Sequence, residues 1–336
     1  MPTSRTFTRA AAVLIASTVA LVGCSSSADD AAENSDTTAA ASSDGSWPRT
    51  VDTEQGPVEI PAQPERILST AVTLTGSLLA IDAPVVASGA TSPNTDVADG
   101  QGFFTQWGDI AAERAVEPLP ATDIDVEQVI GQNPDLIVVS KTGADSAIDL
   151  YDQLSAVAPT IVVDYGNNSW QDVTELLGEA TGHEAQAQEK IATFEDLVAS
   201  AKAEMALPPQ PTTALVYNGA EGSNVWTEES AQGSLLTELG FTLADIPSAA
   251  LGDTSMGARK DIVQISPENY SLALAGQTVV LVTADDTDVA EYRADPLLAQ
   301  TPAVQQQHVY AVGLDTFRLD YYSATNFVER LQEELS

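Results

Sequence analysis

Short apolar runs rich in β-branched residues recur along the chain, and stretches with helical spacing of apolar positions separate them. Most of these runs are continuous rather than alternating, which is typical of strands that helices cover on both faces. The runs lie at 66–70, 85–89, 136–140, 160–164, 213–217, 225–227, 278–282 and 308–312. Their alternation with helices predicts an α/β protein with mainly parallel sheets.

The runs form two groups with a similar order of events. In the first group, Glu127 stands at the start of a predicted helix that leads into the run at 136–140. In the second, Glu268 stands at the start of a predicted helix that leads into the run at 278–282. We therefore expect two similar α/β lobes, at 47–182 and 208–336.

One long helix is predicted between the lobes, at 183–207. Its apolar positions recur at helical spacing, and Pro208-Pro209 ends it. Thr181 and Glu184 have the spacing of a capping box at its start. About 23 helical residues reach about 35 Å, which is enough to run across both lobes. A single rigid connector of this kind permits only small movements of the lobes.

The amino-terminal residues have the pattern of a lipoprotein signal peptide. Arg5 and Arg9 precede an apolar stretch at 10–22, which is shorter than the roughly 20 residues that span a bilayer. The stretch ends in Leu21-Val22-Gly23-Cys24, the form of a lipobox, so we expect residues 1–23 to be removed and Cys24 to be acylated. The alternative is a buried structural cysteine. Residues 24–46, mostly Ser, Ala, Asp and Thr, predict a flexible acidic tether to the extracytoplasmic face of a membrane.

Charge and missing chemistry narrow the class of protein. Against 49 acidic residues stand 13 basic ones, for a net charge of −36, which excludes a broad basic face for nucleic acid or anionic lipid. Apart from Cys24 the chain has no thiol, and its two histidines, His183 and His308, are read as structural or surface residues. It lacks the G-x-S-x-G, Walker A and dinucleotide-binding motifs. A solute receptor without a cofactor is therefore favoured over an enzyme, and a carboxylate-based hydrolase stays open as an alternative.

Several longer stretches carry a resemblance to a known family. They are 69–79, 150–155, 226–233 and 316–324, with the run Phe317-Arg318-Leu319-Asp320-Tyr321-Tyr322 and residues 78–84 as the more specific parts. They resemble the ferric enterobactin-binding proteins of siderophore ABC transporters. These lie within the wider family of iron-siderophore, haem and cobalamin receptors, which have the class III periplasmic-binding-protein fold with one backbone helix between two lobes.

The resemblance implies a function and partners. It implies a monomeric receptor that delivers a ferric catecholate siderophore to an ABC permease, with the iron held by the siderophore and no direct metal ligand from the protein. A receptor of the same fold for another siderophore, haem or cobalamin is the alternative.

Binding a trianionic ferric catecholate calls for weakly hydrated cations and flat aromatic faces, which favours arginine over lysine. Arg318 follows the predicted strand at 308–312 at its carboxyl end, where ligands of α/β folds bind, and the resemblance implies that it contacts the siderophore. The alternative for Arg318 is an ion pair with Asp315 or Asp320. The other candidates are Trp226, Arg259, Lys260, Phe317 and Tyr217. The alternative for Trp226 is an ordinary core tryptophan without ligand contact. For Arg259 and Lys260 the alternative is that both side chains lie in a loop exposed to solvent.

Three further residues enter through the resemblance. Glu127 and Glu268 match positions that dock into arginine pockets of the permease, and a charge stabilised at a helix amino terminus is the alternative for each. Asp96 occupies a place where relatives carry an arginine that helps to bind the ligand. Its carboxylate would repel a trianion, so a less charged or differently shaped catecholate stays open as an alternative ligand. Arg66 begins a predicted strand and is interpreted as structural.

Overall fold

The computed structural model describes residues 45–120, 124–251 and 260–336. The predicted signal peptide at 1–23, Cys24, most of the predicted tether and Arg259 lie outside the described residues. None of the described helices combines the length and the apolar character that crossing a bilayer requires.

The first lobe is built on a five-stranded sheet in which every strand runs in the same direction. The strand order is β5-β4-β3-β6-β7, because the chain starts in the middle of the sheet and adds strands on both sides. The strands are β3 Ile67–Ser69, β4 Val85–Ala90, β5 Glu117–Pro120, β6 Leu136–Ser140 and β7 Thr160–Val163.

Alternate residues of this sheet enter two separate cores. Ile67 and Val138 belong to one hydrophobic cluster, whereas their neighbours Leu68 and Ile137 belong to another. Both faces of the sheet are thus buried, as the continuous apolar runs predict. The helical segments of this lobe are α1 Val72–Ala80, α2 Gly108–Glu113, α3 Val126–Gly131, the 3₁₀ turn η1 Ile148–Leu150, α4 Tyr151–Ser155 and α5 Trp170–Thr181.

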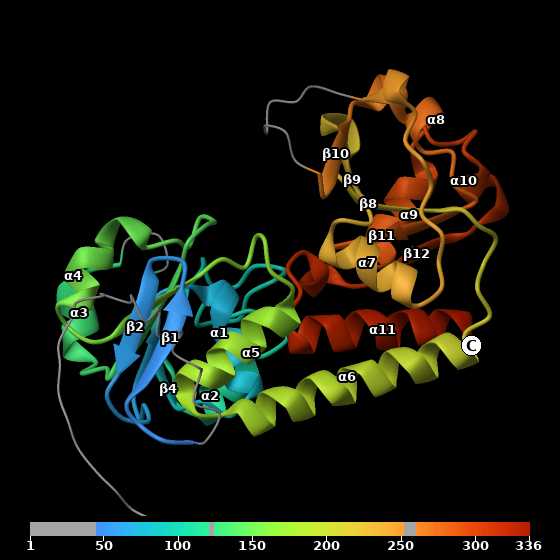
Figure 1. Ribbon diagram of the computed structural model, residues 1–336. Helices are drawn as coiled ribbons and strands as arrows, with labels where there is room; N and C mark the ends of the chain where they lie inside the picture. Colours follow the sequence, from blue (N-terminus) through green and yellow to red (C-terminus); the bar gives the residue numbers. More distant parts are fainter. Residues whose placement is uncertain (1–44, 121–123, 252–259) are drawn as a thin grey trace, which may run out of the picture. The chain divides into compact units, whose positions relative to one another are not determined.

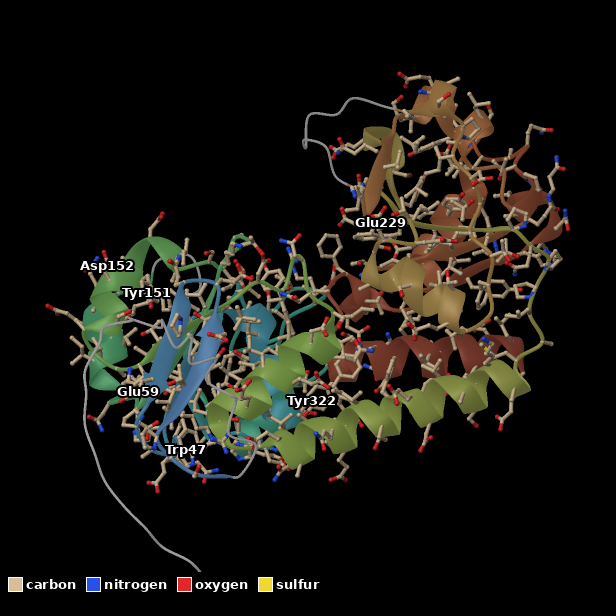
Figure 2. All side chains as sticks on the ribbon, viewed as in Figure 1. Trp47, Glu59, Tyr151, Asp152, Glu229 and Tyr322 are labelled. Atoms are coloured by element: carbon tan, nitrogen blue, oxygen red, sulfur yellow. The ribbon has the colours of Figure 1, made fainter. Side chains whose placement is uncertain are left out.

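A β-hairpin that the sequence pattern does not reveal precedes this sheet. It pairs β1, Arg49–Thr53, with β2, Gly56–Ile60, in antiparallel fashion. The amide N–H of Glu54 donates to the carbonyl of Val162, which fastens the hairpin turn to strand β7. Trp47, labelled in Figure 2, stands just before the hairpin, and its ring lies under the guanidinium of Arg49 at 4.4 Å.

The second lobe has a sheet of the same size but mixed direction. Its order is β10-β9-β8-β11-β12, and β9 runs antiparallel to both of its neighbours. The strands are β8 Thr212–Tyr217, β9 Ser223–Trp226, β10 Ile262–Ile265, β11 Thr278–Leu281 and β12 Val309–Ala311. The helices are α7 Ala231–Glu238, α8 Tyr270–Ala273, α9 Asp286–Ala294, α10 Pro302–Gln306 and α11 Tyr321–Leu335, with 3₁₀ turns η2 Gly219–Glu221, η3 Ser248–Ala250, η4 Pro267–Asn269 and η5 Leu314–Thr316.

The long helix predicted at 183–207 is α6, Glu184–Glu204, which packs against α5 and α11 (Figure 1). The expected capping box of Thr181 and Glu184 is wrong. Thr181 is the last residue of α5 and its hydroxyl donates to Leu177, while Gly182 ends that helix in the left-handed conformation at φ 76°. The next helix, α6, therefore starts at Glu184, and its N-cap residue His183 makes no side-chain cap.

The lobes are joined by more than this connector. Tyr322 of α11 packs against the core of the first lobe, and Trp170 of α5 belongs to the core of the second. The two sheets fall within the predicted lobe ranges 47–182 and 208–336, and those limits remain our proposal.

Candidate ligand-binding site

A cavity of about 560 Å³ lies where the five parallel strands of the first lobe end. Each strand contributes residues at or just after its carboxyl end, which is where a parallel sheet gathers its loops. The lining residues are Val72, Thr73, Ala90, Thr91, Ser92, Gln101, Phe104, Pro118, Leu119, Pro120, Ala144, Asp145, Tyr165 and Arg318. Only the last of these belongs to the second lobe.

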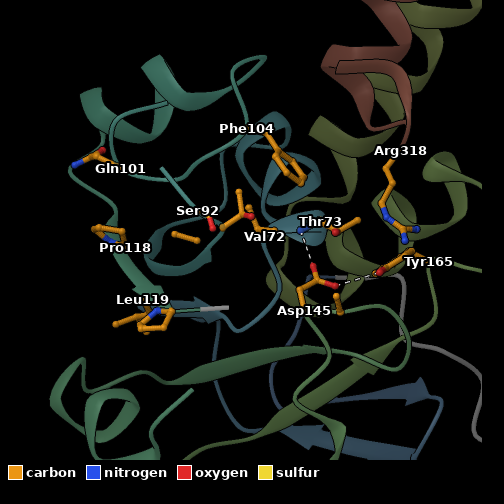
Figure 3. Close-up of a pocket in the computed structure, with 14 residues that line it drawn as sticks. Val72, Thr73, Ser92, Gln101, Phe104, Pro118, Leu119, Asp145, Tyr165 and Arg318 are labelled. Carbon is orange, nitrogen blue, oxygen red and sulfur yellow. Dashed lines mark hydrogen bonds between the residues drawn. The ribbon is translucent and has the colours of Figure 1, made fainter. Parts of the chain in front are cut away.

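Asp145 draws three of these loops together. Its side chain, on the loop after β6, is buried, and the residue is 7% exposed. One carboxylate oxygen accepts the backbone N–H of Thr73 at 3.0 Å, and the other accepts the hydroxyl of Tyr165 at 3.1 Å (Figure 3). The start of α1 and the loops after β6 and β7 are thus tied to one buried carboxylate.

Tyr165 fits against the loop that carries Asp145 because of a glycine. Gly143 adopts φ +97°, a conformation that side chains rarely allow, and a Cβ added there would overlap the Tyr165 hydroxyl. Burial, and next the negative charge of Asp145, raise the pKa of Tyr165, while Arg318 works against the rise. The hydroxyl therefore keeps its proton near neutral pH and donates it to Asp145.

Arg318 reaches the cavity from the loop between η5 and α11. Its guanidinium carbon lies 4.6 Å from the ring centre of Tyr165 and 5.6 Å from that of Phe317. These are cation–π distances. Figure 3 shows the side chain beside Tyr165.

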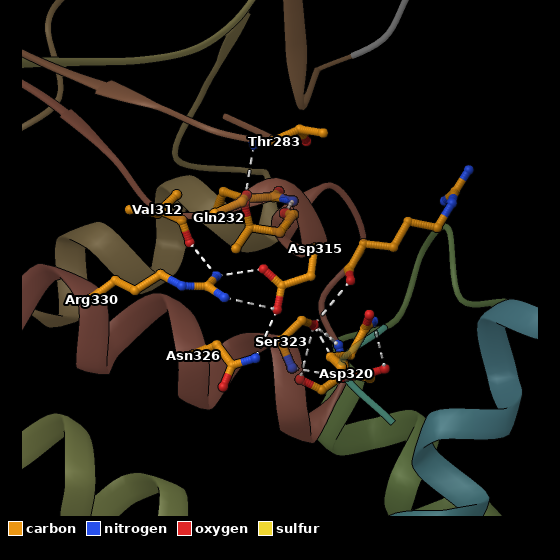
Figure 4. Close-up of polar contacts among 12 residues, drawn as sticks. Gln232, Thr283, Val312, Asp315, Asp320, Ser323, Asn326 and Arg330 are labelled. Carbon is orange, nitrogen blue, oxygen red and sulfur yellow. Dashed lines mark hydrogen bonds and ion pairs between the residues drawn. The ribbon is translucent and has the colours of Figure 1, made fainter. Parts of the chain in front are cut away.

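Neither of the expected carboxylate partners holds Arg318. Asp315 pairs with Arg330 and also accepts from Asn326 at 2.7 Å (Figure 4). Asp320 caps α11 through the backbone N–H and hydroxyl of Ser323 and accepts a longer bond from Gln106 of the first lobe at 3.4 Å. Throughout the described part of the chain, Arg318 makes no ion pair with a carboxylate within 4.0 Å.

The predicted aromatic contacts lie near Arg318 but outside the cavity lining. Phe317 is 41% exposed, and its ring meets that of Trp226 edge-on at 5.8 Å. Trp226 is only 6% exposed and belongs to the second-lobe core. Its place fits the alternative of a core tryptophan, and contact with a ligand stays a prediction for both residues.

Tyr217 and Lys260 both lie outside the cavity, and their contacts are with other residues. The hydroxyl of Tyr217 donates to Asp295 at 2.6 Å, and burial together with that bond raises the pKa of Tyr217. The side chain of Lys260 is 81% exposed and reaches Glu229 only at 3.9 Å. The turn that carries Glu229 is labelled in Figure 2. Neither Tyr217 nor Lys260 lines the cavity, and their binding roles stay predictions.

Sequence reasoning finds Arg318 but misses the first-lobe side of the site. Thr73, Asp145 and Tyr165 each follow a predicted strand by a few residues, and this position is the available signal. Asp96 is exposed and does not line the cavity. The described residues also offer no group of three or more His, Cys, Asp or Glu placed to hold a metal ion.

The remaining predicted residues lie elsewhere on the lobes. Glu127, in the first turn of α3, and Glu268, in η4, are both exposed. Arg66 donates to the carbonyls of Gln132 and Asn133 just after α3, at the start of β3, which agrees with its interpretation as structural.

The chain belongs to the periplasmic binding protein family, whose model matches residues 67–315. Its fold is therefore that of the two-lobed class III binding proteins, as the sequence predicts, and the family is one of substrate-binding proteins rather than enzymes.

Individual relatives sharpen this placement. The chain is 52% identical to the ferric enterobactin-binding periplasmic protein FepB of Escherichia coli O6:H1 over 287 residues, which cover 85% of this chain and 90% of that protein. The crystal structure of holo-ViuP shares 39% identity at a TM-score of 0.77, over 87% of this chain and 96% of that one. The structure of Staphylococcus aureus SirA complexed with staphyloferrin B, at 20% identity and a TM-score of 0.64, shares the fold over 85% of this chain and 99% of that one. The predicted resemblance to ferric enterobactin-binding proteins is confirmed.

Proposed function

We propose that this protein captures a ferric catecholate siderophore, of the enterobactin type, in the cavity and delivers it to an ABC permease for iron uptake. The observation that carries the proposal is Arg318, whose guanidinium enters the cavity over an aromatic ring and makes no ion pair with the described carboxylates. The name of the 52% identical relative supports the choice of ligand.

The chemistry of the cavity suits such a ligand. A ferric tris-catecholate carries three negative charges on paired oxygens, and an arginine can fork its N–H donors onto such pairs. Phe104 adds aromatic surface, and Thr73, Thr91 and Ser92 add polar groups. A volume of about 560 Å³ falls within the usual range of small-molecule sites, roughly 300–1,000 Å³.

Quenching of tryptophan fluorescence tests the ligand. The chain has four tryptophans, and Trp226 stands against Phe317, the neighbour of Arg318. Titration with ferric enterobactin should quench the emission with a saturable curve, and iron-free enterobactin and ferric citrate serve as controls. Quenching by haem or cobalamin, with none by any ferric catecholate, would reject the proposal in favour of another ligand of this fold.

A second candidate is a catecholate of lower negative charge. The described lining carries one basic side chain, Arg318, and one acidic side chain, Asp145, so its own charges offset each other. This candidate predicts that a less charged ferric catecholate binds more tightly than ferric enterobactin. It also predicts that Asp145→Asn shifts the preference towards the trianion. If the trianion binds more tightly to the unaltered protein, the first candidate stands.

Delivery to the permease is assigned to Glu127 and Glu268. Both carboxylates are exposed, one on each lobe, and are free to enter basic pockets of a partner. The double substitution Glu127→Arg with Glu268→Arg should leave ligand binding unchanged and stop iron uptake in cells that depend on this protein. Substitution of the exposed Glu59 and Glu113 by Arg provides a control of equal charge change. Normal uptake by the first double variant would remove the docking assignment.

We also propose that Cys24 carries the lipid that holds the protein on the extracytoplasmic face of the membrane and that it acts as a monomer. Mass spectrometry of the purified amino-terminal peptide should find acyl chains on Cys24. Cys24→Ala should shift the protein from the membrane to the soluble fraction. Light scattering of that soluble form should give the mass of one chain.

A further inference from the structure

Arg318 stands in an unusually acidic protein and still lacks a carboxylate partner among the described residues. A guanidinium is normally drawn into a bidentate pair with any carboxylate within reach. Such a pair would compete with the ligand, because it would have to break before the ligand oxygens could take the same N–H donors. The structure therefore raises the question of what keeps Arg318 in the cavity and available.

Part of the answer is that the nearest carboxylates in sequence are occupied. Asp315 is neutralised by Arg330 and bonded by Asn326. Asp320 is buried beneath the first turn of α11, where Ser323 bonds it. The two acids nearest to Arg318 in sequence thus have their oxygens satisfied by other groups, and Asp145 in the cavity accepts from Thr73 and Tyr165.

The other part is the ring of Tyr165. A cation–π contact engages the flat face of the guanidinium and leaves the N–H groups at its edge unused. At 4.6 Å, the Tyr165 ring can hold Arg318 without consuming the donors that a ligand needs. The contact also crosses between lobes, since Tyr165 follows β7 and Arg318 precedes α11.

The Tyr165 side chain is itself held in place through its hydroxyl group. Its hydroxyl donates to the buried Asp145, and Gly143 leaves the space in which that hydroxyl sits. Asp145 is fixed in turn by the N–H of Thr73 at the start of α1. The position of the Tyr165 ring is thus fixed by contacts among the start of α1 and the loops after β6 and β7.

We propose that Tyr165 is a positioning residue that holds Arg318 in its ligand-accepting orientation before the ligand arrives. Its effect on affinity acts through Arg318 rather than through contact of its own with the ligand. This proposal rests on the proposed function, because the site of action is the same cavity.

A double-mutant cycle with ferric enterobactin tests this role. Tyr165→Leu removes the ring and should weaken binding about 3- to 30-fold. Tyr165→Phe keeps the ring and should restore the affinity to within about twofold of the unaltered protein. In an Arg318→Ala background, Tyr165→Leu should cost less than about twofold, because its target is already gone.

A matched control separates positioning from general loss of the cavity wall. Phe104→Leu also removes an aromatic ring from the lining, but among the described residues the cation–π contacts of Arg318 are with Tyr165 and Phe317, not with Phe104. Its effect on affinity should be the same with and without Arg318. If Tyr165→Leu behaves like Phe104→Leu, losing equal affinity in both backgrounds, Tyr165 contacts the ligand and the proposal is overturned. Thermal unfolding identifies any variant that does not fold, and Tyr165→Met then replaces Tyr165→Leu.

A measurement without ligand keeps this proposal separate from the identity of the siderophore. The chain has only nine arginines, so selective isotope labelling of arginine gives a simple NMR spectrum. The side-chain protons of Arg318 should be shifted upfield by the Tyr165 ring at 4.6 Å, should keep this shift in Tyr165→Phe, and should lose most of it in Tyr165→Leu, where only the more distant Phe317 ring remains. An Arg318 signal that Tyr165→Leu leaves unmoved contradicts the proposal even if ferric enterobactin binds. A clear shift in a protein that binds no ferric catecholate would reject only the proposed function.

Discussion

The two lobes carry sheets of equal size, yet they meet the cavity in different ways. In the first lobe all five strands run in one direction, and every one of them sends residues into the lining. In the second lobe β9 runs against its neighbours, and the described lining takes only Arg318 from that lobe. A wholly parallel sheet collects its loops at one edge, whereas a reversed strand sends its carboxyl end to the opposite edge.

This difference separates two tasks. The first lobe provides the shape of the cavity and a buried support around Asp145, and the second provides the positive charge. A substitution in the second lobe should therefore change affinity with little effect on shape. A substitution in the first should change shape and stability together.

The largest effect is expected from Arg318→Ala. Loss of the cation that the second lobe contributes should weaken ferric catecholate binding by about 2–5 kcal/mol if the pair with the ligand is desolvated. The stability of the fold should hardly change, because Arg318 makes no ion pair within the described residues. Titration by fluorescence quenching measures the affinity. Arg293→Ala is the control, since Arg293 lies in the same lobe, does not line the cavity and donates to the backbone carbonyls of Gln307 and Val309; an equal loss in that variant would remove the special role of Arg318.

A first-lobe change, Gly143→Ala, should act on fold and affinity together. The added methyl group needs the space of the Tyr165 hydroxyl, and the backbone stays in a left-handed conformation. We expect the free energy of unfolding to fall by about 1–3 kcal/mol, with weaker binding. Gly131→Ala is the matched control, because a Cβ added at this last residue of α3 would enter open space. Unchanged stability in Gly143→Ala would show that the Tyr165 side chain can move to make room for the added methyl group at little cost in free energy.

Asp320 tests the place where the lobes touch. Burial raises the pKa of Asp320, so the folded protein holds a proton there more tightly than the unfolded chain does. Stability should therefore fall as pH rises from the ordinary aspartate pKa to the raised one. Asp320→Asn keeps a capping side chain and removes that slope, with a gain on the order of 1 kcal/mol at pH 7. Denaturant unfolding at several pH values measures it, and an unchanged slope in the variant would assign it to another group.

The smallest effect is expected from Lys260→Ala. The side chain is exposed, and its contact with Glu229 at 3.9 Å is long, so stability should change by less than about 0.5 kcal/mol. Binding of a ferric catecholate at physiological salt should also change little. A large loss of affinity would show that Lys260 as well as Arg318 contributes positive charge to the ligand site. The second lobe would then contribute more to binding than the single residue Arg318.

The sequence predicts those parts of the fold that local pattern determines. The run at 136–140 becomes β6 with the same limits, because Leu136-Ile137-Val138-Val139-Ser140 is a short apolar run with β-branched residues, and the sheet buries all five. Strand β5 escapes prediction because its four residues include two prolines. The hairpin β1–β2 escapes it because its strands, RTVDT and GPVEI, contain only Val51, Val58 and Ile60 as large apolar residues and form no continuous apolar run.

The same distinction, between features set by local sequence and features set by the folded structure, applies to the binding site. Arg318 could be predicted because it follows a recognisable strand within a characteristic run of residues. Its freedom from Asp315 could not, because that depends on Arg330 reaching the same carboxylate from within α11. The bond between Tyr165 and Asp145 likewise joins two loops that only the completed sheet brings together.

Arg49 has a consequence for where the folded unit begins. Its buried guanidinium bonds the carbonyl of Glu179 at the end of α5 and the carboxylate of Glu184 at the start of α6, so the first strand clamps the corner between these helices. Removal of the hairpin would take these bonds from that corner and would also remove the fully buried side chains of Val51 and Ile60 from the first-lobe core. A chain shortened to begin just before Trp47 should therefore still fold and bind, whereas one that begins beyond Ile60 should not fold.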